Sequence, residues 1–333
     1  QKLILTLIIH EHIRTAQPVG SKSLVEKYNL AMSSATVRNE MAALTDFELL
    51  RQPHTSAGRV PTEEGYRYFV GNLIQQSGLP TTIRRTIAHQ FYQSRQDIEQ
   101  WLKLAASVLA NQSQAASLVT APRAEKTIFK HMELIATHGR QVLMVIVFMD
   151  GEIRQQFISL AEPVPQVRLS RIAGRLTELC SRCDIDQASR LRGQLDALGQ
   201  EILDILLAEM ALVEKSATGE IYLDGMTNVL SEPEFSESDE ARQALHILEE
   251  RSLLENLLVS TVMNTDVGGI QVLIGGEGGW DELRQCSVVL ARYGDPNSLT
   301  GSIGVLGPIR MPYDRTISTV RFVANVLSDL VSD

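Results

Sequence analysis

The sequence predicts a multidomain α+β protein in which an N-terminal winged helix-turn-helix precedes a larger body of helices and mostly antiparallel strands. Three observations predict this architecture. The chain has 333 residues, whereas single hydrophobic cores usually stop growing at about 250 to 300 residues. Helix-type spacing of apolar residues over 2–44 is followed by two strand-like runs around a polar loop at 53–58. Further along, Asp150-Gly151 separates two apolar runs, which is a strong hairpin signal.

Composition and cysteine usage are typical of a globular protein from a reducing compartment. Hydrophobic residues make up 44% and charged residues 21% of the chain, and no apolar run approaches the roughly 20 residues that a membrane helix needs. The apolar run Leu3–Ile9 lacks a basic leader and a cleavage site, so we do not expect a signal peptide. Cys180, Cys183 and Cys286 give no disulfide framework, and the first two lack further zinc ligands nearby. We therefore expect a cytoplasmic protein with no metal, no cofactor and no membrane partner.

The net charge of -9 at first argues against a nucleic-acid partner, because phosphate contacts need a basic surface. The charge is unevenly distributed, however. Residues 1–70 carry 8 Lys and Arg against 7 Asp and Glu, so the remaining 263 residues carry 23 against 33. The negative charge therefore lies outside the N-terminal segment, and a small DNA-binding module needs only a local basic face.

Three helices are expected in the N-terminal segment. The first spans about Lys2–Arg14. Ser21 is a good N-cap for a second, short helix, and Ser33 or Ser34 is a good N-cap for a third. On the third helix the apolar residues at i, i+4 and i+7 face the core, namely Val37, Met41 and Leu44.

The opposite side of the third helix offers groups that suit the major groove of DNA. Arg can bond guanine, and Asn adenine, through two hydrogen bonds, while hydroxyls and the helix N-terminus suit phosphates. Any small helical bundle also exposes polar residues, so this pattern alone leaves both interpretations open. The candidate DNA-binding residues of the helix pair are Lys22, Ser33, Ser34, Thr36, Arg38 and Asn39.

A strand, a loop and a return strand are expected at 49–52, 53–58 and 59–61, followed by a helix that Thr62 caps. This strand-loop-strand segment has the layout of a wing. Its cationic and hydroxyl side chains can lie along the sugar-phosphate backbone or enter a minor groove. The candidate DNA-binding residues of the wing are Arg51, His54, Thr55, Ser56 and Arg59.

Several segments resemble hallmark segments of the heat-inducible transcription repressor HrcA family. In the N-terminal part these are PVGSK at 18–22, SSATVRNEM at 33–41 and QPHTSAGRVPT at 52–62. In the C-terminal part they are YLDG at 222–225, PEF at 233–235, IGGE at 274–277 and GSIGVLGPIRM at 301–311, with Tyr313. The resemblance therefore extends over essentially the whole chain.

This resemblance implies a negative regulator of heat-shock (chaperone) operons, which binds an inverted-repeat operator in double-stranded DNA as a homodimer and is released on heat stress. It also implies the chaperonin GroEL as a modulating partner, and a GAF-like α+β domain with an inserted dimerisation segment. The expected layout is a DNA-binding domain at 1–76, a linker at 77–84 and a GAF-like domain at 85–333, interrupted by the insertion at about 150–215. The residue patterns by themselves indicate only a DNA-binding module on a larger acidic body.

The body is expected to alternate between helices and strands. Helices are predicted to about residue 118, at 167–183 and at 185–213, with a final helix that carries Ile317, Val320, Ala324, Leu327 and Val331 on one face. Strands are predicted at 129–137, 142–149, 153–160, 269–274, 286–293 and 301–307.

The helix around residues 191–213 is apolar on more than one side, which indicates that it is buried. Two interpretations remain open: contact with a second chain, or a central helix of its own domain. A repressor that binds two half-sites needs a two-fold dimer, with recognition helices roughly 34 Å apart or a multiple of that. The candidate dimerisation residues are Leu195, Leu198, Ile202, Ile205, Leu206 and Met210.

The sequence does not predict an enzyme. Its seven histidines are scattered, and no Gly-x-Ser-x-Gly motif or Gly-Lys-Ser/Thr phosphate loop occurs. The main alternative is a metabolite-responsive winged-helix repressor, because GAF-like domains often hold small ligands. The acidic stretch 231–240 contains five carboxylates and is expected to be a solvated loop, with a chaperonin contact or a brake on misplaced DNA as alternatives.

Overall fold

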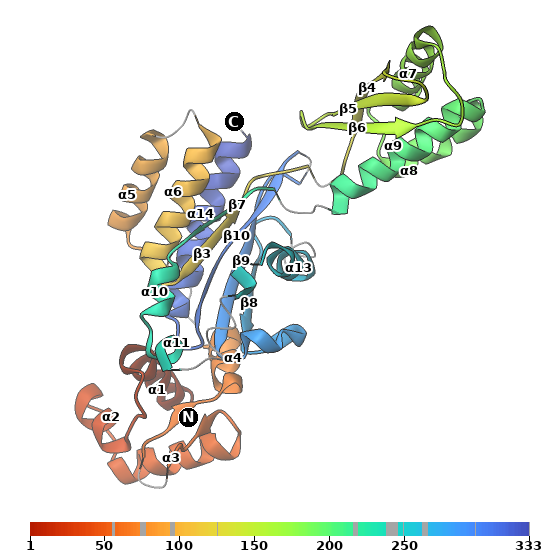
Figure 1. Cartoon of the computed structure of the whole chain (residues 1–333). Coiled ribbons are helices and arrows are strands. Elements are labelled where there is room, and N and C mark those ends of the chain that lie inside the picture. The colour runs from red at the N-terminus through yellow and green to blue at the C-terminus, as the bar shows by residue number, and fades with distance from the viewer. Residues whose placement is uncertain are drawn as a thin grey trace. The chain divides into compact units, whose positions relative to one another are not determined.

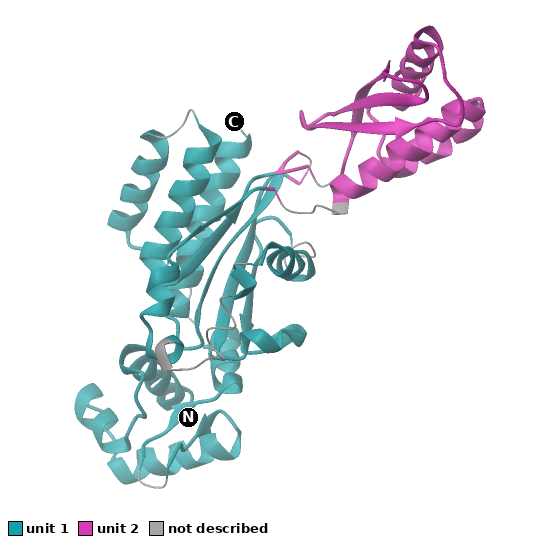
Figure 2. Ribbon diagram, viewed as in Figure 1, with its two compact units in different colours: residues 1–122, 220–295, 300–333 teal, residues 123–219, 296–299 magenta. Residues whose placement is uncertain are grey.

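The computed structural model describes residues 1–54, 57–73, 78–93, 97–124, 126–215, 219–237, 246–248, 250–261, 266–296 and 298–332. The chain is a mixed α+β protein whose described strand pairs are all antiparallel (Figure 1). It folds into two compact units (Figure 2): unit 1 contains 1–122, 220–295 and 300–333, and unit 2 contains 123–219 and 296–299. Within the described ranges, no helix combines the length and the apolar character that crossing a bilayer requires.

Residues 1–73 of unit 1, which we call the head, contain four helices and one hairpin. The elements are α1 (Lys2–Thr15), α2 (Ser21–Tyr28), α3 (Ser34–Asp46), β1 (Leu50–Arg51), β2 (Val60–Pro61) and α4 (Glu63–Asn72). Thr62 caps α4 by accepting the Gly65 N–H, as predicted, and of the two serines expected to cap α3 it is Ser33 that accepts the Thr36 N–H. The cap position of α2 is Gly20, and not Ser21 as expected. The first three helices meet in a core that includes Ile4, Leu5, Ile8, Ile9, Leu24, Val37, Met41 and Leu44.

The rest of unit 1, which we call the body, is built on a five-stranded antiparallel sheet of order β7-β3-β10-β9-β8. Its strands are β3 (Ala116–Thr120), β7 (Ile221–Asp224), β8 (Ile270–Ile274), β9 (Cys286–Gly294) and β10 (Thr300–Pro308). β9 and β10 pair along their whole length, and every residue of both strands is buried. Such continuous burial requires cover on both faces of the sheet.

Helices supply that cover. On one face Val289 and Val305 belong to a cluster with α6 (Ile98–Ser113) and α14 (Tyr313–Ser332), and α5 (Thr81–Gln93) packs beside α6 (Figure 1). On the other face Val288 and Leu306 belong to a cluster with α13 (Arg251–Thr261). The body also contains the short helices α10 (Met226–Leu230), α11 (Pro233–Glu237), η2 (Glu277–Gly279) and η3 (Asp281–Leu283).

Two sequence-based expectations about the body differ from the structure. Helix was expected to about residue 118, but α6 ends at Ser113 and residues 116–120 form β3, between β7 and β10. Periodicity cannot distinguish a short, fully buried strand from a helix segment, which explains the error. The linker expected at 77–84 overlaps α5, which begins at Thr81.

Unit 2 is a three-stranded antiparallel sheet of order β4-β5-β6 with helices packed against it. Its elements are β4 (Phe129–Ala136), β5 (Gln141–Phe148), β6 (Ile153–Ser159), α7 (Gln166–Cys180), α8 (Ile185–Arg190), η1 (Arg192–Gln194) and α9 (Ala197–Lys215). The unit begins at Arg123, whereas an insertion was expected from about residue 150. The difference arises because the strands bury Met144 and Ile146 against the helices of this unit.

Helix α9 lies in the core of unit 2. Ile202, Leu206 and Met210 are 0% exposed and belong to one cluster with side chains of the sheet and of α7. These three side chains therefore pack inside their own unit, on the buried side of a helix whose other side is exposed. The other candidate dimerisation residues keep part of their surface and pack at the edge of this core, namely Leu195, Leu198 and Ile205.

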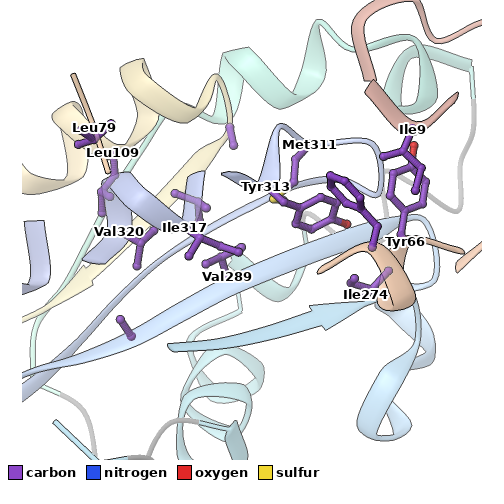
Figure 3. Packing of buried hydrophobic residues seen from close by; sticks show 14 of the residues in the cluster. Ile9, Tyr66, Leu79, Leu109, Ile274, Val289, Met311, Tyr313, Ile317 and Val320 are labelled. Atoms are coloured by element: carbon purple, nitrogen blue, oxygen red, sulfur yellow. The ribbon is translucent and has the colours of Figure 1, made fainter. Parts of the chain in front are cut away.

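Head and body share one continuous hydrophobic core (Figure 3). Tyr66 of α4 packs against Tyr313 of α14, with ring centroids 5.9 Å apart, and both side chains are buried. Ile9 of α1, Ile274 of β8 and Met311 belong to the same cluster. The head is therefore packed directly onto the end of the body sheet.

Candidate nucleic-acid interface

Helix α3 has one buried and one exposed face. The buried side chains are at most 3% exposed and are Val37, Met41 and Leu44, as the spacing predicted. The exposed polar side chains of its first two turns are Thr36, Arg38 and Asn39. The N-terminal half of α3 therefore presents a hydroxyl, a guanidinium and a carboxamide to the outside.

The start of α3 is fixed by its cap. Ser33 Oγ accepts the N–H of Thr36 at 3.1 Å and lies 2.9 Å from Thr36 Oγ1. Ser34 is half-buried. The Ser33 hydroxyl therefore holds the helix start in place, and any contact that it makes with a ligand comes in addition to this structural task.

A buried carboxylate joins α1 to α2. The Glu11 carboxylate accepts hydrogen bonds from Arg14 Nη2 at 2.6 Å, from Tyr28 Oη at 3.2 Å and from Lys27 Nζ. Only 7% of this residue is exposed. Hydrogen bonds from Arg14 and then from Lys27 lower the pKa of Glu11 to about 2. This carboxylate holds α2 against α1 and so helps to fix the position of α3.

The cations near α3 differ in how strongly they are paired. Lys22 lies 3.9 Å from Glu26, and both side chains are largely exposed, so this pair contributes little. Arg38 and Arg51 are exposed, and neither has a hydrogen-bond or ion-pair partner among the described residues. A ligand can therefore bind these two guanidinium groups without breaking an internal hydrogen bond.

Arg59 ties the hairpin to the rest of the head. Its backbone exchanges two hydrogen bonds with Val19, of 2.8 and 2.9 Å. Its guanidinium donates to Gln52 Oε1, and Gln52 Nε2 donates to the Ala57 carbonyl at 3.1 Å. A Cβ atom at Gly58 would lie 2.3 Å from the Val19 carbonyl oxygen, so only glycine fits there. Arg59, predicted as a DNA contact, thus has an internal partner.

The role of Gln52 could not be predicted from the sequence, because an isolated polar residue beside a strand carries no signal of its partner. Of the other predicted wing residues, Arg51 and His54 are exposed. Thr55 and Ser56 lie outside the described residues. The wing candidates that the structure describes therefore all lie on or beside the β1-β2 hairpin.

The cysteines show no sign of a redox or metal site. Burial raises the pKa of Cys180 to about 11 and also raises that of Cys183, so both thiols are protonated near neutral pH. Cys286 is buried in the body, where its pKa rises to about 12. In the part of the chain that the structure describes, no three His, Cys, Asp or Glu side chains gather as metal ligands.

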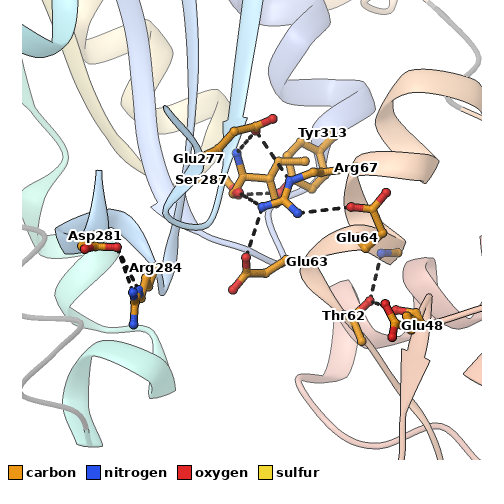
Figure 4. Close-up of polar contacts among 12 residues, drawn as sticks. Glu48, Thr62, Glu63, Glu64, Arg67, Glu277, Asp281, Arg284, Ser287 and Tyr313 are labelled. Atoms are coloured by element: carbon orange, nitrogen blue, oxygen red, sulfur yellow. Dashed lines mark hydrogen bonds and ion pairs between the residues drawn. The ribbon is translucent and has the colours of Figure 1, made fainter. Parts of the chain in front are cut away.

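A cleft of about 890 Å³ lies between the head and the body. Four arginines and four glutamates line it, so it favours neither anions nor cations by net charge. Several of these groups are paired with one another, for example Arg67 with Glu63 and Glu64 (Figure 4). The charges that line this cleft therefore do not by themselves favour the alternative of a metabolite-responsive repressor.

The comparisons with known proteins agree along the whole chain. Residues 99–317 match the family model described as HrcA protein C terminal domain. Proteins called heat-inducible transcription repressor HrcA are 44% identical in Roseiflexus castenholzii, 42% in Herpetosiphon aurantiacus and 39% in Thermomicrobium roseum. These comparisons cover 100% of this chain and 94%, 95% and 95% of the respective relatives.

A solved structure described as that of a hypothetical protein is also similar, with 25% sequence identity and a TM-score of 0.59 over 99% of this chain and 96% of that one. The family model covers well over half of the chain, and the relatives match it from end to end. The chain therefore belongs to the heat-inducible transcription repressor HrcA family, whose members are transcriptional regulators and not enzymes.

Proposed function

We propose that this protein represses heat-shock operons by binding an inverted-repeat operator, with the head acting as a winged helix-turn-helix. In this proposal α3 is the recognition helix and the β1-β2 hairpin is the wing. The observation that carries the proposal is the amphipathic character of α3. Its apolar face is buried in the head, while Arg38 and Asn39 are exposed in its first two turns, where recognition helices contact base edges.

The available groups suit two kinds of contact. A guanidinium such as that of Arg38 can bond guanine bidentately, and a carboxamide such as that of Asn39 can bond adenine. Arg51, His54 and Lys22 are exposed, and the cations among them suit phosphates. The nearly balanced charge of the head makes the attraction of one head weak, so tight binding requires two heads acting together.

We further propose that unit 2 supplies the contact between two chains. On the sheet face opposite α7 and α9, Ile135 and Phe157 flank Leu143 on the central strand, and Ile153 lies beside Val147. The exposed fractions are 44% for Ile135, 56% for Ile153 and 68% for Phe157. Large apolar side chains that gather on one exposed sheet face are typical of a protein interface.

The remaining parts of the proposal rest on the family. The body is inferred to be a GAF-like domain, which its five-stranded antiparallel sheet with helices on both faces supports. Heat inducibility is part of the names of the relatives. We infer that the chaperonin GroEL modulates the repressor, as the family resemblance implies.

The test is a footprint of the purified full chain on a chaperone-operon promoter, with and without purified chaperonin. The expected result is protection of two symmetric half-sites at nanomolar protein, with stronger protection when chaperonin is present. No preference for the promoter over scrambled DNA would refute the operator-binding proposal. Equal protection with and without chaperonin would refute only the modulation.

A further inference from the structure

Two arginines cross the contact between head and body in opposite directions. Arg67 of α4, in the head, donates from Nη2 to the carbonyl of Ile274 at the end of β8, at 2.9 Å. Arg310, between β10 and α14 in the body, donates from Nη1 to the carbonyl of Ile13 in the last turn of α1, at 3.2 Å. Each guanidinium thus bonds a backbone carbonyl of the other part.

The Ile13 carbonyl is a favourable acceptor. It belongs to the last four residues of α1 (Lys2–Thr15), whose carbonyls have no partner within the helix. The C-terminal end of a helix also carries partial negative charge, which attracts a cation. Arg310 therefore caps a helix of the head from the body, and this hydrogen bond constrains the position of the C-terminal end of α1.

Carboxylates hold Arg310 in place. Glu234 accepts hydrogen bonds from Nε of Arg310 at 2.5 Å and from Nη2 at 3.1 Å. Glu232 accepts a further hydrogen bond from the same Nη2. Only 12% of the Arg310 side chain is exposed, so solvent and salt screen these contacts weakly. Glu232 and Glu234 are the first two carboxylates of the acidic stretch 231–240, which was expected to be a solvated loop. Instead, this part of the stretch orients an arginine.

Arg67 is held in a comparable way (Figure 4). Glu63 and Glu64 accept from it at 3.2 and 3.3 Å, and Glu277 of η2 lies 3.7 Å from its Nε. Glu277 also accepts the N–H of Ile274 at 3.1 Å, which fixes the strand end that Arg67 bonds. A cluster of carboxylates thus surrounds each arginine, and the apolar Tyr66–Tyr313 contact belongs to the same junction.

We propose that Arg67 and Arg310 are positioning residues for operator binding: they fix the orientation of the head on the body, and thereby the spacing of the two recognition helices in a dimer. This inference rests on the proposed function. A dimer gains affinity from its second head only when that head already faces the second half-site, and a rigid attachment removes the cost of ordering it. A loosely attached head keeps its own DNA contacts and forfeits this gain.

The test compares DNA with two half-sites and DNA with one, using the full chain. The double variant Glu232→Gln/Glu234→Gln removes the charges that hold Arg310 and keeps the side-chain sizes. The control Glu178→Gln removes a carboxylate of unit 2 whose side chain is 71% exposed. We expect the double variant to lose on the order of tenfold or more in affinity for the operator and less than twofold for a single half-site. The control should change neither.

Amide hydrogen exchange of the same proteins without DNA gives an independent measurement. In the double variant, exchange at the end of α1 and in α4 should become several-fold faster, while exchange in the middle of α3 stays unchanged. Equal losses of affinity on both DNAs, or no loss on either, would overturn the proposal. If the wild-type chain showed no preference for the operator over scrambled DNA, the proposed function would fail. The role of the arginines in attaching the head would then be judged by amide exchange alone, and unchanged exchange in the double variant would overturn it.

Discussion

The Nδ1 atom of His12 lies 2.7 Å from the hydroxyl oxygen of Tyr66, which joins α1 to α4 at the contact between head and body. Burial lowers the pKa of His12 to about 4, with a further lowering contribution from the nearby positive charge of Arg310. Burial raises the pKa of Tyr66 well above its usual value. Both side chains are therefore neutral near pH 7, as a hydrogen bond beside a shared hydrophobic core requires.

The first prediction concerns pH. Between the ordinary histidine pKa of 6.5 and the folded value of about 4, the unfolded chain binds a proton on His12 more readily than the folded chain. The contribution of His12 to stability is therefore complete above pH 6.5 and falls as the pH drops toward 4, by about 1 to 2 kcal/mol at pH 5. Urea unfolding at pH 7 and pH 5 should show a smaller loss for His12→Gln than for the wild type. Parallel losses would exclude His12 as the titrating group.

The second prediction concerns the carboxylate between α1 and α2. Glu11→Gln replaces a charged acceptor of three hydrogen bonds by a neutral one, and should lower the free energy of unfolding by about 1.5 to 3 kcal/mol at pH 7. Glu26→Gln is the matched control, because that side chain is 66% exposed and should change stability by less than about 0.5 kcal/mol. Chemical denaturation checks both variants, and equal effects would contradict the structural role of Glu11.

The third prediction concerns base preference. Arg38→Ala and Asn39→Ala should each reduce discrimination at one position in each half-site by about 1 to 3 kcal/mol, because both side chains project from α3, the proposed recognition helix. Arg85→Ala, which changes an exposed arginine of α5, should leave this discrimination unchanged. Competition binding with single-base operator variants measures the effect. If operator and scrambled DNA lose affinity equally, these residues do not contact bases.

The fourth prediction separates the charge of Arg59 from its position. Arg59→Ala should weaken binding to all sequences and flatten the dependence of log K on log salt by about one unit of slope for each phosphate that the variant no longer binds. Gln52→Ala leaves the charge in place and removes its hydrogen-bond partner, so affinity should fall while the slope remains. Salt titrations of both variants distinguish the two effects. An unchanged slope in Arg59→Ala would remove Arg59 from the phosphate contacts.

The fifth prediction concerns dimerisation. Phe157→Asp places a charge on the exposed face of the unit 2 sheet and should convert the proposed dimer into a monomer at micromolar concentration, as measured by sedimentation velocity. Leu198→Asp, at the edge of the α9 core, tests the surface predicted from sequence. If Leu198→Asp dissociates the dimer and Phe157→Asp does not, the contact lies at the helix and not at the sheet face.

Local features of the head could be predicted because their signals lie within a few residues of one another. The spacing of Val37, Met41 and Leu44 predicts the buried face of α3, and Ser33 and Thr62 predict two helix starts. The strand 116–120 was missed because its neighbours β7 and β10 lie about a hundred or more residues away in the sequence. In the same way, the apolar rows of α9 predicted burial, but not whether its own unit or a second chain would cover them.

The sequence by itself therefore determined the α+β class, the family and the exposed polar face of α3. Only the tertiary structure decided how the head is attached to the body. Arg310 and the Ile13 carbonyl are 297 positions apart in the chain, and Arg67 and the Ile274 carbonyl are 207 apart. Helix periodicity and capping act between neighbouring residues, whereas these hydrogen bonds exist only because the folded core brings distant backbone carbonyls to the two arginines.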